Sequence, residues 1–131
     1  MDSKLQEIIS SSTYDLQDGR YIYIKAKSVQ NWEDHFMVSK DNDEITVVTR
    51  EENLAKLDTI EKNKDYYRLI ALNVTVPFYS VGFLAAVSST IAKEGMNVLI
   101  ISTYSKDYIM VRFDLLDNAI KVLQNLGFKS L

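Results

Sequence analysis

The second half of the chain carries apolar segments whose spacing changes from strand-like to helical. An apolar run over residues 67–76 ends at the only proline, Pro77, and proline suits a strand end because it lacks an N–H donor. Apolar and small residues then recur three and four positions apart on one predicted helix face: Val81, Leu84, Ser88 and Ile91. Gly95 follows where a helix commonly ends. The pattern therefore predicts a strand over 67–76 and a helix over 80–94.

A second set of elements of the same kinds follows. Residues 97–103 are strongly apolar and predict a buried strand, and a tight turn at Ser105 and Lys106 leads into a strand over 108–113. A broad apolar helical stripe occupies residues 115–126, with Asp114 as a plausible N-cap and Gly127 as the stop. The last residues, 128–131, are long enough for a short edge strand. The resulting order, βαββαβ, predicts an α+β, ferredoxin-like fold for this half.

The first half is less regular than the second and consists mainly of short predicted strands. We expect a short helix over 4–9, a polar connection over 10–19, strands over 20–27, 35–39 and 45–49, a short helix over 50–58 and a polar linker over 59–65. The change in character near the linker predicts two units, residues 1–62 and residues 63–131.

Composition narrows the classes of function. The chain has 131 residues, of which 47% are hydrophobic, enough for one domain or two very small ones. A net charge of −3 without a basic cluster argues against a nucleic-acid partner. The absence of cysteine excludes disulfides and thiolate nucleophiles. No apolar run approaches the roughly 18 residues of a membrane span, and the N-terminus is too polar for a signal peptide, so we expect a cytoplasmic protein without a membrane partner.

Metal and acid–base chemistry find little support in the sequence. His35, the only histidine, is interpreted as an ordinary strand residue. The acidic residues Asp41, Asp43 and Glu44 resemble the start of a calcium loop, but the required glycine and the later glutamate are missing. No acid–base pair can be located. We therefore expect no metal, no cofactor and no enzymatic activity.

The turn between the strand at 67–76 and the following helix is the candidate binding site. It places the backbone N–H groups of Val81, Gly82 and Phe83 at a helix N-terminus, which favours an anion such as a carboxylate. On the neighbouring parallel strand, Ser102, Thr103 and Tyr104 end close to the same place, and Asp107 follows, where it can meet an ammonium group. These groups suit a free amino acid. A purely structural interpretation competes: Ser80 caps the helix, Gly82 permits close packing and Asp107 suits a turn.

The segment from Val76 to Val111 resembles the ACT domain, specifically the small tandem ACT proteins related to the arginine sensors of animals (CASTOR type). The resemblance is carried by Ser80, Gly82, Phe83-Leu84, Gly95, Ser102-Thr103-Tyr104 and Asp107-Tyr108-Ile109. It covers residues 66–128 well. Residues 15–24 and 45–52 resemble the degenerate, strand-rich first ACT unit of the same proteins.

This resemblance implies a tandem ACT fold and a non-catalytic regulatory module that binds an amino acid or similar effector at interfaces between ACT units. Carried over by position, Phe78, Ser80, Val81 and Gly82 hold the carboxylate end, while Ser102, Thr103, Tyr104 and Asp107 line the opposite wall. It also implies a homodimer and a regulated protein partner. The alternative is a ligand-free interaction module whose tyrosines, Tyr21, Tyr23, Tyr66 and Tyr67, build a dimer or adaptor surface.

Overall fold

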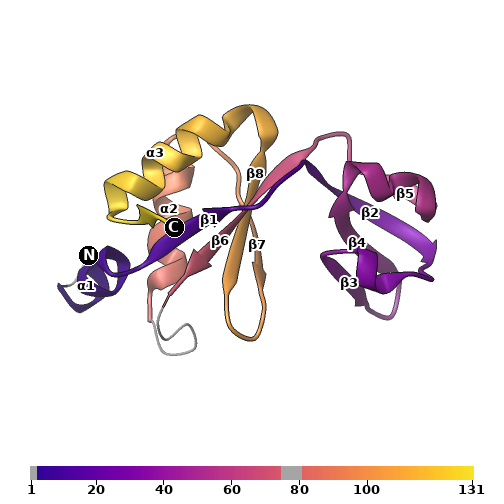
Figure 1. Ribbon diagram of the computed structural model, residues 1–131, viewed down its shortest axis with the longest axis horizontal. Helices are drawn as coiled ribbons and strands as arrows, with labels where there is room; N and C mark the ends of the chain where they lie inside the picture. The colour runs from indigo at the N-terminus through magenta and orange to yellow at the C-terminus, as the bar shows by residue number, and fades with distance from the viewer. Residues whose placement is uncertain (1–2, 75–80) are drawn as a thin grey trace. The chain divides into compact units, whose positions relative to one another are not determined.

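The computed structural model describes residues 3–74 and 81–131 and has the mixed α+β composition that the sequence predicts (Figure 1). The chain divides into two compact units, whose boundaries differ from the predicted division after residue 62. Unit 1 combines Met1–Asp18 with Arg68–Leu131, and unit 2 is Gly19–Tyr67. The N-terminal segment joins the C-terminal half because Leu5, Ile9 and Tyr14 are buried in its hydrophobic core.

Unit 1 contains a sheet whose strands follow the order β9-β1-β6-β8-β7. Its strands are β1 (Thr13–Leu16), β6 (Tyr67–Asn73), β7 (Leu99–Ser102), β8 (Asp107–Arg112) and β9 (Lys129–Ser130), and its helices are α1 (Ser3–Ser10), α2 (Phe83–Lys93) and α3 (Leu116–Leu126). From β6 to β9 the order is the predicted βαββαβ. The difference lies in β1, predicted as a polar connection, which pairs antiparallel with β6 and parallel with β9. The last strand therefore lies beside β1.

Both long helices of unit 1 pack on one face of its sheet. Ile70, Leu72, Ile109 and Val111 of the central strands belong to the same buried cluster as residues of α2 and α3. The buried face of α2 differs from the predicted one and consists of Phe83, Val87 and Ile91. The helix begins at Phe83 after Gly82, so Val81 precedes it and is 90% exposed.

Three further local expectations for unit 1 have different outcomes. Gly127 ends α3 as predicted, in a left-handed conformation with φ 120°. Asp114 is not its N-cap: the 3-10 turn η4 (Phe113–Leu115) precedes the helix, and Arg112 binds the Asp114 carboxylate through Nε at 2.6 Å and Nη2 at 3.0 Å. That hydrogen-bonded pair lowers the pKa of Asp114. β7, predicted to be buried, pairs with β8 at the sheet edge and alternates half-buried with exposed residues.

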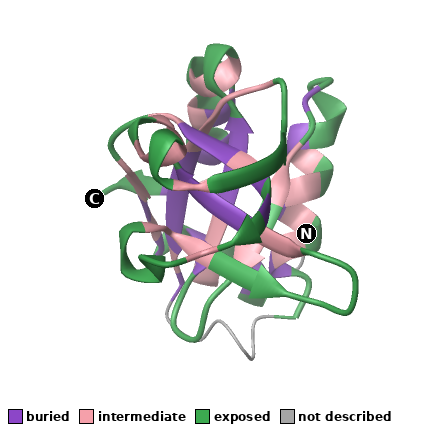
Figure 2. Cartoon of the chain, turned by 90° about the vertical axis from the view of Figure 1, so that its right-hand side faces the viewer, coloured by how far each residue is buried: buried purple, intermediate pink, exposed green. Residues whose placement is uncertain are grey.

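Unit 2 is built from antiparallel strands in the order β3-β4-β2-β5. Its strands are β2 (Tyr21–Ser28), β3 (Met37–Lys40), β4 (Ile45–Arg50) and β5 (Asp58–Lys62), joined by the 3-10 turns η1 (Trp32–Asp34) and η2 (Glu51–Lys56). The predicted helix over 50–58 is thus mainly a 3-10 turn, and most of the predicted linker is β5. The buried residues of unit 2 lie on β2 and β4, whereas β5, most of β3 and most turn residues are exposed or half-buried (Figure 2). None of the helices in the described part of the chain is long and apolar enough to cross a membrane.

Candidate functional site

A buried carboxylate lies where β7 and β8 meet their connecting turn. Ser102 and Asp107 are partners in the antiparallel ladder, and Ser102 Oγ donates a hydrogen bond of 2.7 Å to Asp107 Oδ1. Asp107 is only 6% exposed, although the sequence placed it in the turn. Thr103 closes the turn, because its N–H and its Oγ1 both donate to the carbonyl of Lys106, at 2.8 and 3.0 Å. A buried carboxylate requires hydrogen-bond donors or a positive charge, and Ser102 supplies one neutral donor.

The start of α2 directs backbone N–H groups out of the helix. Gly82 is the N-cap in a left-handed conformation with φ 82°, and it makes no side-chain capping bond. Its carbonyl accepts the N–H of Ala86 at 2.9 Å, whereas the N–H groups of the first turn have no acceptor within the helix. The N-terminus of α2, the C-terminal end of β6 and the β7–β8 turn all lie at the same end of the strands of the unit 1 sheet (Figure 1). This agrees with the arrangement predicted from the strand order.

The side chains of two predicted site residues, Phe83 and Tyr104, lie in contrasting environments. The Phe83 side chain is 2% exposed and packs edge-on against Phe128, with ring centroids 5.9 Å apart, so only its backbone N–H remains for a ligand. Tyr104 lies in the β7–β8 turn and is 85% exposed. The predicted residues Phe78 and Ser80 lie outside the described residues. Sequence reasoning missed Leu5 of α1: a Cβ at Gly82 would lie 3.7 Å from its Cδ2 atom.

The tyrosines proposed to form an adaptor surface pack mainly within unit 2. Tyr21 is buried, and the rings of Tyr23 and Tyr67 meet edge to face with centroids 6.3 Å apart. Burial raises the pKa of Tyr23, and the nearby Tyr67 raises it further. Tyr66 receives the Arg20 guanidinium 4.7 Å from its ring centroid. These internal contacts do not favour the ligand-free adaptor surface.

Arg20 also forms an ion pair with Glu51 at the start of η2. The guanidinium donates from Nε and from Nη2, the latter at 2.8 Å to Oε1. This pairing lowers the pKa of Glu51 and raises the pKa of Arg20. Within the described ranges, no group of three or more His, Asp or Glu side chains is arranged to hold a metal ion.

The chain was compared with protein-family models, curated proteins and solved structures. Residues 64–125, somewhat less than half of the 131-residue chain, match the family model of the ACT domain. None of the curated proteins matches the chain. ACT domains are typically regulatory modules that bind small molecules such as amino acids.

Solved structures of similar fold cover nearly the whole chain. A protein of unknown function and possible transport protein from Vibrio cholerae shares 20% identity, covers 95% of this chain and 96% of its own, and has a TM-score of 0.79. A protein from Agrobacterium tumefaciens shares 17% identity with this chain, and the match covers 92% of each chain with a TM-score of 0.74. The ligand-free regulatory subunit of aspartate kinase from Thermus thermophilus shares 8% identity. The match covers 88% of this chain and 95% of that subunit, with a TM-score of 0.61. At these identities the likeness establishes the fold, which is ACT-like.

Proposed function

We propose that this chain is a non-catalytic regulatory protein that binds a free amino acid or a similar small effector and acts through a protein partner. The observation that carries the proposal is Asp107, a 6% exposed carboxylate whose side-chain partner is the neutral Ser102 hydroxyl. A buried carboxylate next to a neutral donor is suited to receive a ligand cation. The ACT domain match of residues 64–125 supports the same class of ligand.

The proposed ligand spans two groups of unit 1. Its carboxylate binds the N–H groups at the start of α2, around Val81, Gly82 and Phe83, and its ammonium binds Asp107. The helix dipole favours the anion at this end, and charge-assisted hydrogen bonds fix both ends of the ligand. The remaining proposed lining residues are Phe78, Ser80, Ser102, Thr103 and Tyr104.

Regulation requires that the ligand binds one arrangement of the protein better than another. We propose that the chain acts as a cytoplasmic homodimer in which ligand binding biases the placement of ACT units, and that a partner protein reads this arrangement. The resemblance to the tandem ACT arginine sensors of animals makes arginine the first amino acid to test.

A thermal-shift screen against the common L-amino acids tests the proposal. A ligand at 100 times its dissociation constant should raise the free energy of unfolding by about 2.7 kcal/mol. Asp107→Asn keeps the side-chain size but removes the charge, so it should weaken binding at least about tenfold, a loss of about 1.4 kcal/mol. The matched control is Asp114→Asn, at an exposed carboxylate that is paired with Arg112. If no amino acid shifts the transition, or if both variants bind as the parent does, the proposed site is wrong.

A further inference from the structure

Unit 2 contains a hollow of about 390 Å³. It is lined by Tyr21, Asp34, His35, Phe36, Arg50, Glu52 and Asn53, all within Gly19–Tyr67. Its volume falls within the range of small-molecule sites, which are clefts of roughly 300–1,000 Å³. It is separate in sequence from the candidate site around Gly82 and Asp107.

A buried hydroxyl holds two of the lining side chains in place. Thr49 of β4 is fully buried, and its Oγ1 lies 2.9 Å from His35 Nδ1. The amide of Asn53 donates to the same Oγ1 at 3.0 Å and to the carbonyl of Asp34, also at 3.0 Å. His35 Nε2 and Asn53 Oδ1 are the polar atoms that this network leaves available. Lining groups fixed in this way are preorganised, which lowers the entropy cost of binding.

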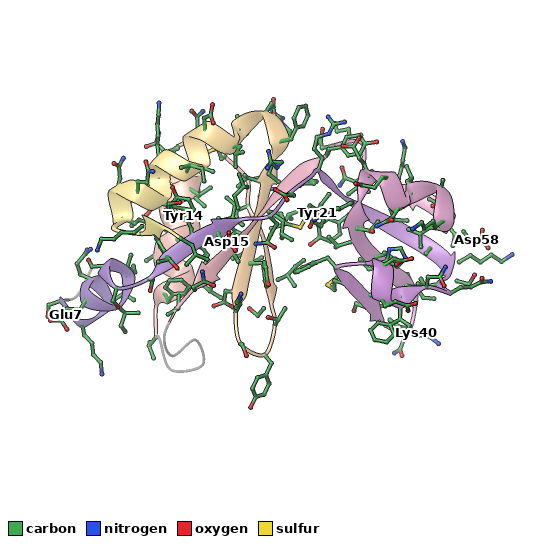
Figure 3. All side chains as sticks on the ribbon, in the orientation of Figure 1. Glu7, Tyr14, Asp15, Tyr21, Lys40 and Asp58 are labelled. Atoms are coloured by element: carbon green, nitrogen blue, oxygen red, sulfur yellow. The ribbon has the colours of Figure 1, made fainter. Side chains whose placement is uncertain are left out.

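The opposite lining combines a cation with aromatic rings. Arg50 Nε donates to the hydroxyl of Tyr21 at 3.3 Å, and the guanidinium carbon lies 6.0 Å from the centroid of the Tyr21 ring. Tyr21 is labelled in Figure 3. Phe36 meets Tyr21 edge to face, with centroids 6.3 Å apart. The aliphatic part of Arg50 packs beside Gly19, where a Cβ would lie 3.4 Å from Arg50 Cδ. These contacts hold the guanidinium beside an apolar wall.

The charges lining the hollow have both signs. Arg50 is positive, whereas Glu52 and Asp34 are negative, and Asp34 is already paired with Lys56 at 3.6 Å. Within the described ranges, Glu52 belongs to no ion pair. A simple anion would be attracted by Arg50 but repelled by Glu52, and a simple cation would be attracted by Glu52 but repelled by Arg50. A molecule with one carboxylate and one ammonium group matches both charges.

We propose that this hollow is a second small-molecule site that binds a zwitterion, with the ligand carboxylate on Arg50 and His35 Nε2 and the ammonium on Glu52 and Asn53 Oδ1. The inference rests on the proposed function only for the class of ligand, because the residues that carry it belong to unit 2. A chain with both sites binds two ligand molecules. The Tyr21 and Phe36 rings favour a zwitterion with an apolar or planar side chain.

Amide NMR spectra of the full chain test the inference, with each common L-amino acid at about 5 mM, a concentration that reveals millimolar affinities. We expect at least one of them to shift the amide signals of His35, Arg50, Glu52 and Asn53 in a saturable manner. Acetate and methylammonium, each carrying one of the two charges, should bind at least about tenfold more weakly than that amino acid.

Two substitutions separate the two sites. Arg50→Gln should weaken the saturable shifts in unit 2 at least about tenfold and leave those around Gly82 and Asp107 unchanged, whereas Asp107→Asn should do the reverse. Shifts around Gly82 and Asp107 alone would overturn the second site and leave the proposed function standing. Shifts in unit 2 alone would support the second site and overturn the proposed site around Gly82 and Asp107. No saturable shift in unit 2, or one that Arg50→Gln leaves unaltered, overturns the inference.

Discussion

At Gly127, the backbone conformation favours glycine, and two side chains of α1 lie close to the position that a Cβ would take. The residue has φ 120°, and a Cβ there would lie 3.3 Å from both Gln6 Nε2 and Ser10 Oγ of α1. Gln6 also donates to the carbonyl of Leu126 at 3.1 Å. We expect Gly127→Ala to lower the free energy of unfolding by about 2–3 kcal/mol, because it combines backbone strain with displacement of α1. Urea unfolding measures the loss.

Gly95 is the matched control, since it follows α2 with φ 76° and a Cβ there meets nothing within 4 Å. Gly95→Ala should cost only about 1 kcal/mol, the backbone part alone. Equal losses for the two variants would show that α1 does not pack against Gly127 in solution.

The ion pair between Arg20 and Glu51 should make stability depend on pH. Folding lowers the pKa of Glu51 below its ordinary value of 4.5, because Arg20 donates hydrogen bonds to its carboxylate. The stabilisation is therefore present above 4.5 and is lost as the pH falls through the folded-state value. Below pH 4.5 the parent should lose stability more steeply than Glu51→Gln, by a small amount because the pair is solvent-exposed. Urea midpoints measured across this range check the difference.

Glu33→Gln serves as the control for this titration, because Glu33 is exposed and belongs to no ion pair of the described residues. A stability difference between the parent and Glu51→Gln that stays constant across the acid range would contradict the assignment.

Sequence reasoning at single residues succeeded where one residue type has a strong conformational role. Gly127 was predicted to end a helix and does so. The helix face was misassigned because Val81 and Phe83 are both apolar and lie two residues apart, so periodicity alone does not tell where the first turn begins. The burial of Asp107 was also missed, because its hydrogen bond to Ser102 depends on the register of two strands.

Among the helices and strands, α1 illustrates how a short element depends on packing. It has only 8 residues, a length at which an isolated helix is marginal in water. Ile9 is fully buried in the core of unit 1. We expect Ile9→Ala to lower the free energy of unfolding by about 2–5 kcal/mol, because it leaves a cavity between α1 and the remaining core. Chemical denaturation followed by circular dichroism provides the measurement.

Ile60→Ala is the corresponding control, because Ile60 of β5 is 58% exposed, and its effect should stay within about 0.5 kcal/mol. If Ile9→Ala were as mild as this control, α1 would not be part of the folded core.

The elements missed from the sequence share a physical cause. β1 and β5 have only 4 and 5 residues, and all residues of β5 are exposed, so neither strand shows a clear apolar pattern. They form because β6 and β2 offer backbone hydrogen bonds from distant parts of the chain. The elements between 67 and 126 were predicted because each carries a core-facing pattern long enough to recognise.

For the whole molecule, the proposed homodimer gives a prediction about mass. The chain has a mass of 15.0 kDa, so light scattering coupled to gel filtration should give about twice that value at micromolar concentration. Ligand binding should change the dimer dissociation constant if the ligand favours one arrangement of the chains. A mass of one chain at all concentrations, with and without amino acids, would contradict the homodimer.

The order βαββαβ predicted a ferredoxin-like arrangement, and the link to the ACT domain came from a resemblance, whereas the grouping of distant segments into compact units was not predictable. The boundary after residue 62 followed a local change in composition, but the grouping of Met1–Asp18 with Arg68–Leu131 depends on pairing between β1 and β6. No local pattern reports contacts between segments so far apart. The candidate site was predicted in part, because strand order sets which ends share an edge, while the roles of Phe83 and Leu5 depend on side-chain packing.

Because unit 1 combines Met1–Asp18 with Arg68–Leu131, its first strand is synthesised well before the strands that pair with it. β1 emerges from the ribosome before Gly19–Tyr67, whereas most of its antiparallel partner β6 emerges after that segment and its parallel partner β9 later still. Unit 2 has all its strands available much sooner and is free to fold first. β1 therefore stays without its partner β6 until Gly19–Tyr67 has been synthesised, and we expect chaperones to contact residues 3–16 during that interval.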